Sequence, residues 1–202
     1  ALERIAAESP NAVLISGDLF DHRLDAHAPA FRAAVQWIQK LANCAPVLVL
    51  QGTFSHDVPG TLDILSALHA RFSVAVATEE STWALGLRGW ERTAQPQSDH
   101  SLAVFAWPPI NRGLLAATGD VNVAYRAYAS DVLQRAQVFA AHARTMSIPT
   151  VLTSHGTVNG CVTENGQTLV SPDHELAIGE LFETGYDVVA LGHIHKHQVW
   201  EK

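Results

Sequence analysis

The sequence predicts a layered α/β domain. Short aliphatic runs, such as the one from Val188 to Leu191, have the composition of strands that are buried on both faces. Between these runs lie segments whose apolar residues recur at helical spacing, such as residues 29–43. Four of the runs end in polar clusters. In open α/β folds the carboxyl ends of strands are where functional sites assemble.

Composition limits the class of protein. The chain has 202 residues, 48% of them apolar and 16% charged, which suits one substantial globular domain. No apolar run approaches the roughly 18 residues that cross a membrane, and no signal segment opens the chain, so we expect no membrane association. Two cysteines, Cys44 and Cys161, give no disulfide framework, and the expected location is cytoplasmic. The net charge of −7 argues against a free-standing duplex-DNA binder, although bound divalent ions would attract phosphate locally.

The first third of the chain alternates helices and strands. We expect the end of a helix at residues 1–9, an amphipathic helix at 29–43 and a helix at 61–69 capped by Thr61. Strands are expected at 12–15 and 46–50. A chain of this type that opens inside a helix suggests that a first strand preceded it.

The middle and the end of the chain predict a second sheet and its helices. Residues 72–76, 83–87 and 102–106 resemble strands of that second sheet, separated by polar turns. A long helix follows at 120–145, with Tyr125, Tyr128 and Phe139 along an apolar stripe that we assign to helix packing. The pattern closes with a strand at 150–153, a helix at 175–184 that stops at Gly185, and the strand that ends at Leu191.

Acidic and imidazole side chains gather at the strand ends. Asp18 and Asp21 follow the first predicted strand, and His155 follows a later one. His193 and His195 are spaced i, i+2 after the last strand, so on extended chain they project to the same side. Mixed carboxylate and imidazole ligands suit manganese, iron or zinc, and the absence of thiolate argues against a closed structural zinc site.

These motifs resemble a known superfamily. The series G-D-x-x-D, S-H-D, a strand-end His and then G-H-I-H is similar to the calcineurin-like metallophosphoesterases, in order over nearly the whole chain. The segments SGDLFD at residues 16–21 and LGHIHKHQ at 191–198 most resemble the DNA-repair exonuclease branch, which comprises the SbcD-type nuclease subunits and their phage relatives. Residues 71–145 match only in outline.

The resemblance implies both a fold and an activity. The fold is a four-layer α/β/β/α sandwich that makes residues 1–202 a single nuclease domain. The activity is hydrolysis of DNA phosphodiester bonds by two divalent ions, manganese foremost, with iron, zinc or magnesium as alternatives. An SbcC-type ATPase is the partner that the resemblance implies. The sequence leaves the oligomeric state open, a dimer included.

The resemblance also assigns metal ligands. It implies that Asp18 bridges two metals, that His155 and His193 bind the second metal, and that His195 binds the first. The usual third motif of the family is G-N-H-D or G-N-H-E, and its Asn binds the second metal. Ser55 stands at that position here, and a turn residue or a water-bridged neighbour is the alternative interpretation.

Further residues receive supporting roles. The resemblance places His56 beside the phosphate, where it would stabilise the transition state and assist the leaving oxygen, with Asp57 orienting its ring. It places Asp21 behind the ligands, holding them or their loop in place.

One family motif is missing. The D-x-H motif at the end of the first strand is absent, so we expect a domain that is truncated at its N-terminus and binds the first metal poorly. Two alternatives to a nuclease remain. The chain is a phosphomonoesterase or nucleotide phosphatase of the same fold, or it is a non-catalytic binding module with an incomplete metal site.

Overall fold

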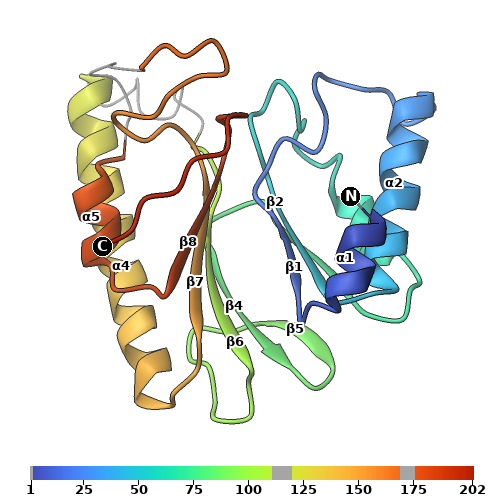
Figure 1. Ribbon diagram of the computed structural model, residues 1–202, viewed down its shortest axis with the longest axis horizontal. Helices are drawn as coiled ribbons and strands as arrows, with labels where there is room; N and C mark the ends of the chain where they lie inside the picture. Colours follow the sequence, from blue (N-terminus) through green and yellow to red (C-terminus); the bar gives the residue numbers. More distant parts are fainter. Residues whose placement is uncertain (1, 111–119, 169–175) are drawn as a thin grey trace.

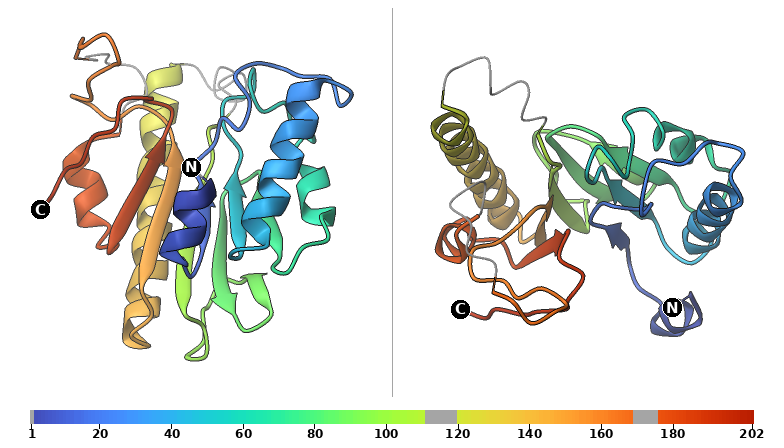
Figure 2. Two further views of the ribbon diagram at one scale, coloured as in Figure 1. Left: turned by 45° about the vertical axis from the view of Figure 1, so that its right-hand side comes forward. Right: turned by 90° about the horizontal axis from the view of Figure 1, so that it is seen from above.

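Two β-sheets pack face to face, with helices on both outer sides (Figure 1). The structure, a computed structural model, describes residues 2–110, 120–168 and 176–202. Seen from above, α2 and α4 lie on opposite sides of the paired sheets (Figure 2). This is the four-layer α/β/β/α arrangement that the resemblance implied.

The first sheet has three parallel strands in the order β1-β2-β3, namely β1 (Val13–Ile15), β2 (Val47–Leu50) and β3 (Val74–Ala77). Helices α1 (Leu2–Glu8) and α2 (Pro29–Ala42) lie on its outer side with the short 3₁₀ helix η1 (Asp63–Ala67). Strand β2 shows why the strands consist of consecutive aliphatic residues. Val47 and Val49 face the helices, while Leu48 and Leu50 face the second sheet, and all four are buried.

The second sheet has five strands in the order β5-β4-β6-β7-β8. Its strands are β4 (Ser81–Gly86), β5 (Gly89–Arg92), β6 (Leu102–Trp107), β7 (Thr150–His155) and β8 (Val188–Gly192). Strand β4 runs antiparallel to both of its neighbours, whereas β6, β7 and β8 are parallel. Helices α4 (Val121–Thr145) and α5 (Ile178–Glu183) cover the outer face.

The long helix predicted at 120–145 is confirmed as α4. Asp120 caps it by accepting hydrogen bonds from the backbone N–H groups of Asn122 and Val123, at 2.8 and 3.3 Å. Phe139 is buried against the sheet, and Tyr125 and Tyr128 pack at the edge of the same core, so the aromatic stripe is helix packing as expected.

Three predictions about elements were wrong or incomplete. The strand predicted at 72–76 belongs to the first sheet, as β3 beside β2, and not to the second. The helix predicted at 61–69 is the five-residue η1 without a side-chain cap, because Leu62 and Leu65 are buried at the three-residue spacing of a 3₁₀ helix. Strand β5 was not predicted. Residue 175 of the predicted 175–184 helix lies outside the described residues.

Within the described residues, no helix is both long enough and apolar enough to cross a membrane. A strand before α1 stays a prediction.

Candidate metal centre

Three potential metal ligands converge where the two sheets meet. Asp18 follows β1 of the first sheet, His155 ends β7 of the second, and His193 follows β8. Their nearest ligand atoms all lie within 4.8 Å of one another. The sequence predicted each of these residues from its position after a strand, and the structure brings them together.

Chain segments come so close together around these ligands that glycine is required at Gly192, where the two sheets meet, and at Gly52, where two loops of the first sheet meet. A Cβ atom on Gly192 would overlap the backbone oxygen of Ser16, and a Cβ atom on Gly52 would overlap the backbone nitrogen of Asp18. The glycines therefore let the ends of β8 and β2 reach the loop that carries Asp18.

His155 is held in a form suited to a metal. Its ring is buried, and Nδ1 lies 2.7 Å from the backbone oxygen of Ser16. A carbonyl oxygen only accepts hydrogen bonds, so Nδ1 carries a proton, and Nε2 is the ring nitrogen that would face a metal. Nε2 lies 3.1 Å from Oδ2 of Asp18.

Two of the three converging residues have strained backbones. Asp18 has φ of 50° and His193 has φ of 95°, in the region that favours glycine. Such conformations cost about 1–3 kcal/mol each and persist where the surrounding structure enforces them, often at functional sites. For Asp18 the enforcing contact is with the loop after β2, because Oδ1 accepts a 2.7 Å hydrogen bond from the backbone N–H of Thr53.

His193 stands edge-on to His155, with ring centroids 5.2 Å apart and an interplanar angle of 71°. Desolvation lowers the pKa of His193 below its ordinary value, and the neighbouring His155 contributes in the same direction. His193 is therefore neutral near pH 7, which is the form that binds a metal.

Asp57 has a different role from the one expected. Its buried carboxylate accepts hydrogen bonds from the backbone N–H groups of Leu19, Phe20 and Gly52, at 3.3, 3.3 and 3.0 Å. Burial raises the pKa of the Asp57 carboxyl, although these three donors act in the opposite direction. Asp57 thus ties the loop after β1 to the loop after β2.

His56 turns toward the metal group and not toward Asp57. Its Nδ1 lies 3.1 Å from Oδ2 of Asp18, and about a third of its side chain is exposed. The partner that orients the ring is therefore Asp18, and the prediction that Asp57 does so was wrong.

Three predicted site residues lie apart from the converging group. Ser55 is exposed in the loop after β2. The His195 side chain is 65% exposed, and its Nδ1 lies 3.6 Å from Glu164. Asp21 is 94% exposed, and its carboxylate lies 3.6 Å from His22.

Sequence reasoning missed Thr53. Its hydroxyl lies 3.2 Å from Nε2 of His155 and 3.4 Å from Oδ2 of Asp18. A signal existed in the sequence, because Thr53 directly follows Gly52, as Asn directly follows Gly in the G-N-H-D motif.

The donor set fits a divalent ion. One carboxylate and two imidazoles converge without a thiolate, which suits manganese, iron or zinc. Asp18, His155 and His193 would hold the ion.

The chain was compared with known proteins. The family model of the calcineurin-like phosphoesterases matches residues 1–197. The chain belongs to this family. The match supports a metal-dependent phosphoester hydrolase and agrees with the two-sheet fold. A comparison with curated proteins finds no match.

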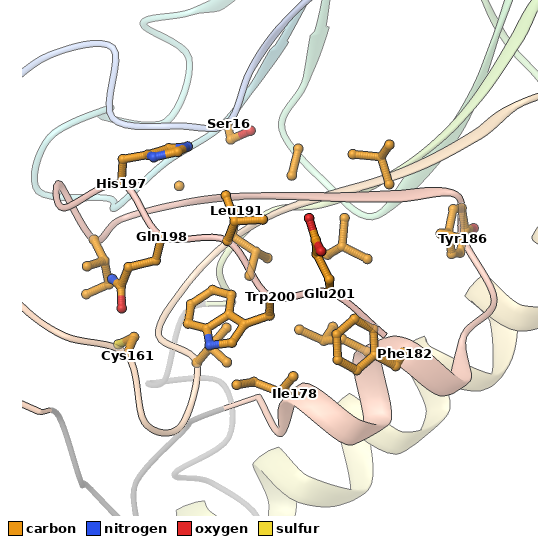
Figure 3. Close-up of a pocket in the computed structure, with 18 of the residues that line it drawn as sticks. Ser16, Cys161, Ile178, Phe182, Tyr186, Leu191, His197, Gln198, Trp200 and Glu201 are labelled. Atoms are coloured by element: carbon orange, nitrogen blue, oxygen red, sulfur yellow. The ribbon is translucent and has the colours of Figure 1, made fainter.

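A cavity of about 930 Å³ adjoins the metal centre of this calcineurin-like phosphoesterase. Ser16 and Gly192 line it near the converging ligands, and its lining includes Phe182 of α5 and Trp200 (Figure 3). Its size is in the range of small-molecule sites.

Proposed function

We propose that this chain is a nuclease that hydrolyses phosphodiester bonds of DNA. The observation that carries the proposal is the convergence of Asp18, His155 and His193 beside His56. The choice of DNA among phosphoesters is supported by the resemblance of residues 16–21 and 191–198 to the repair-exonuclease branch.

Asp18, His155 and His193 would hold a divalent ion, which would supply activation of a water near neutral pH and neutralisation of charge on the phosphate. Hydrolysis adds water across the P–O bond, and the leaving oxygen takes a proton. Protonated His56 has an N–H at Nε2 to give to that oxygen, while Nδ1 donates to Asp18 at 3.1 Å. Asp18 would therefore both hold the ion and orient the acid.

In this proposal Asp18 would contribute to the binding of two divalent ions, with manganese as the preferred metal. His155 and His193 would hold an ion more tightly, because these rings already converge on Asp18. His195 would hold a second ion more weakly, because its side chain is 65% exposed and lies beside Glu164. Ser55, Asp57 and Asp21 have no direct part in the chemistry.

A hydrolase of small phosphate esters is the second candidate. The net charge of −7 favours it, since binding to long DNA is driven by basic residues that neutralise phosphates. A basic partner such as an SbcC-type ATPase would supply such residues for the nuclease.

The test compares substrates in the presence of Mn²⁺. End-labelled single-stranded and duplex DNA, bis(p-nitrophenyl) phosphate and p-nitrophenyl phosphate are each incubated with the purified chain. We expect cleavage of DNA and of the diester, and a loss of more than about 100-fold in His193→Ala. His69→Ala, which alters an exposed histidine outside the site, is the matched control. Hydrolysis of the monoester without any cleavage of DNA would favour the second candidate.

A further inference from the structure

The loop after β2 places a hydroxyl group among the converging ligands. The backbone N–H of Thr53 donates to Oδ1 of Asp18 at 2.7 Å. The Thr53 hydroxyl lies 3.4 Å from Oδ2 of the same carboxylate and 3.2 Å from Nε2 of His155. Its oxygen therefore neighbours the two atoms that Asp18 and His155 would offer to an ion.

The distances between these three atoms, which are hydrogen-bond distances in the structure, also match the spacing of ligands around a metal. Oxygen and nitrogen ligands lie about 2.0–2.2 Å from a first-row divalent ion, so neighbouring ligand atoms are about 3.0 Å apart at right angles and about 3.4 Å apart at tetrahedral angles. The Asp18 Oδ2 to His155 Nε2 distance is 3.1 Å, and the Thr53 hydroxyl is 3.2 and 3.4 Å from these atoms. All three distances fall within or close to that range.

Local backbone geometry explains why Thr53 reaches the site and Ser55 does not. The N–H groups of His56 and Asp57 both donate to the backbone oxygen of Thr53, at 2.9 and 2.8 Å. These bonds close a turn over residues 53–57, which leaves Ser55 exposed and Thr53 against Asp18.

We propose that Thr53, and not Ser55, supplies a hydroxyl ligand to the metal centre beside Asp18, His155 and His193. The inference rests on the proposed function only in that the site holds a divalent ion. The hydroxyl adds a second oxygen donor to the two imidazoles, which favours ions that accept oxygen ligands, such as Mn²⁺.

Calorimetric titration with Mn²⁺ tests the proposal without any substrate. Thr53→Val keeps the shape of the side chain and removes the hydroxyl, and Ser55→Ala removes the competing hydroxyl. We expect Thr53→Val to weaken Mn²⁺ binding by about 10-fold or more, and Thr53→Ser and Ser55→Ala to bind like the wild type. The proposal is overturned if Thr53→Val binds Mn²⁺ normally, or if Ser55→Ala weakens binding as much.

Two further measurements keep the result interpretable. Thermal melts of the metal-free variants check folding. If Thr53→Val is unfolded, Thr53→Ser and Thr53→Ala are compared instead, because they differ by one oxygen atom, and equal Mn²⁺ affinities would refute the ligand role. Failure of the nuclease proposal can be distinguished from failure of the ligand role. If wild-type protein binds Mn²⁺ but does not cleave DNA, the nuclease proposal fails, and the Mn²⁺ affinities of the Thr53 variants still test the ligand role. Wild-type protein that binds no divalent ion overturns the ligand role itself.

Discussion

Replacing Asp57 with alanine should destabilise the fold strongly, although the residue is not a metal ligand. The carboxylate accepts three backbone hydrogen bonds, from Leu19, Phe20 and Gly52, and is itself fully buried. Asp57→Ala leaves these three donors without their acceptor. Two of the three bonds are buried and the third is partly buried, so water replaces the carboxylate poorly.

The size of the loss follows from these three bonds. A buried donor left unsatisfied costs about 1–3 kcal/mol, so the free energy of unfolding should fall by about 3 kcal/mol even at the low end. The raised pKa of Asp57 shows that burying its charge is unfavourable, and relief of that cost keeps the loss toward the low end. For a domain of this size, 3 kcal/mol lowers the melting temperature by about 6–12 °C.

Urea denaturation of metal-free protein, followed by circular dichroism, measures the effect. Asp57→Asn retains one acceptor oxygen and should lose less stability than Asp57→Ala. Asp21→Ala is the matched control, since Asp21 is 94% exposed and its removal should change stability by less than about 0.5 kcal/mol. A loss below about 1 kcal/mol in Asp57→Ala, or an equal loss in Asp21→Ala, would refute the reasoning.

Two other substitutions test the junction of the sheets and the packing of the second sheet. Gly192→Ala should lower stability by about 1–3 kcal/mol and weaken Mn²⁺ binding, because its Cβ would overlap the backbone of Ser16. Gly179→Ala in α5, where a Cβ meets open space, is its control, and equal behaviour of the two in urea denaturation and Mn²⁺ titration would contradict the overlap. Burial raises the pKa of Tyr186 above its ordinary value of about 10, so the unfolded chain ionises first and stability should fall as the pH rises above about 10. Tyr186→Phe should show a smaller alkaline loss in urea titrations at pH 8 and pH 11, and an unchanged loss would count against it.

Much of the fold was predictable because its strands are buried on both faces. β2 and β6 consist of apolar residues, because the side chains on one face of each strand pack against helices and those on the other face pack against the opposite sheet. The prediction of which sheet contains β3 was wrong, because the apolar sequence of a buried strand does not indicate which strand it pairs with. β5 was missed because Glu91 and Arg92, half of its residues, are charged and exposed.

The sequence predicted only those site residues whose positions follow from where the strands end. His195 was expected beside His193 because alternate residues of an extended chain face the same side. The backbone turns at His193, where φ is 95°, and His195 lies near Glu164 instead. Thr53 was missed for a similar reason. The turn at residues 53–57 places the hydroxyl of Thr53, and not that of Ser55, beside Asp18 and His155. In both cases the pattern assumed regular backbone at a position where the structure is irregular.

The irregular positions are also where the two sheets are joined. Strand pairing connects strands within each sheet, so the sheets contact each other through side chains and loops. At the metal centre these contacts are polar: His155 with the backbone of Ser16, and the Ser16 hydroxyl with that of Thr153 at 3.0 Å. An ion held by Asp18 of one sheet and by His155 and His193 of the other would add a further link across the same junction. Metal binding and sheet packing therefore depend on one geometry, which explains why glycine and strained ligand residues occur together there.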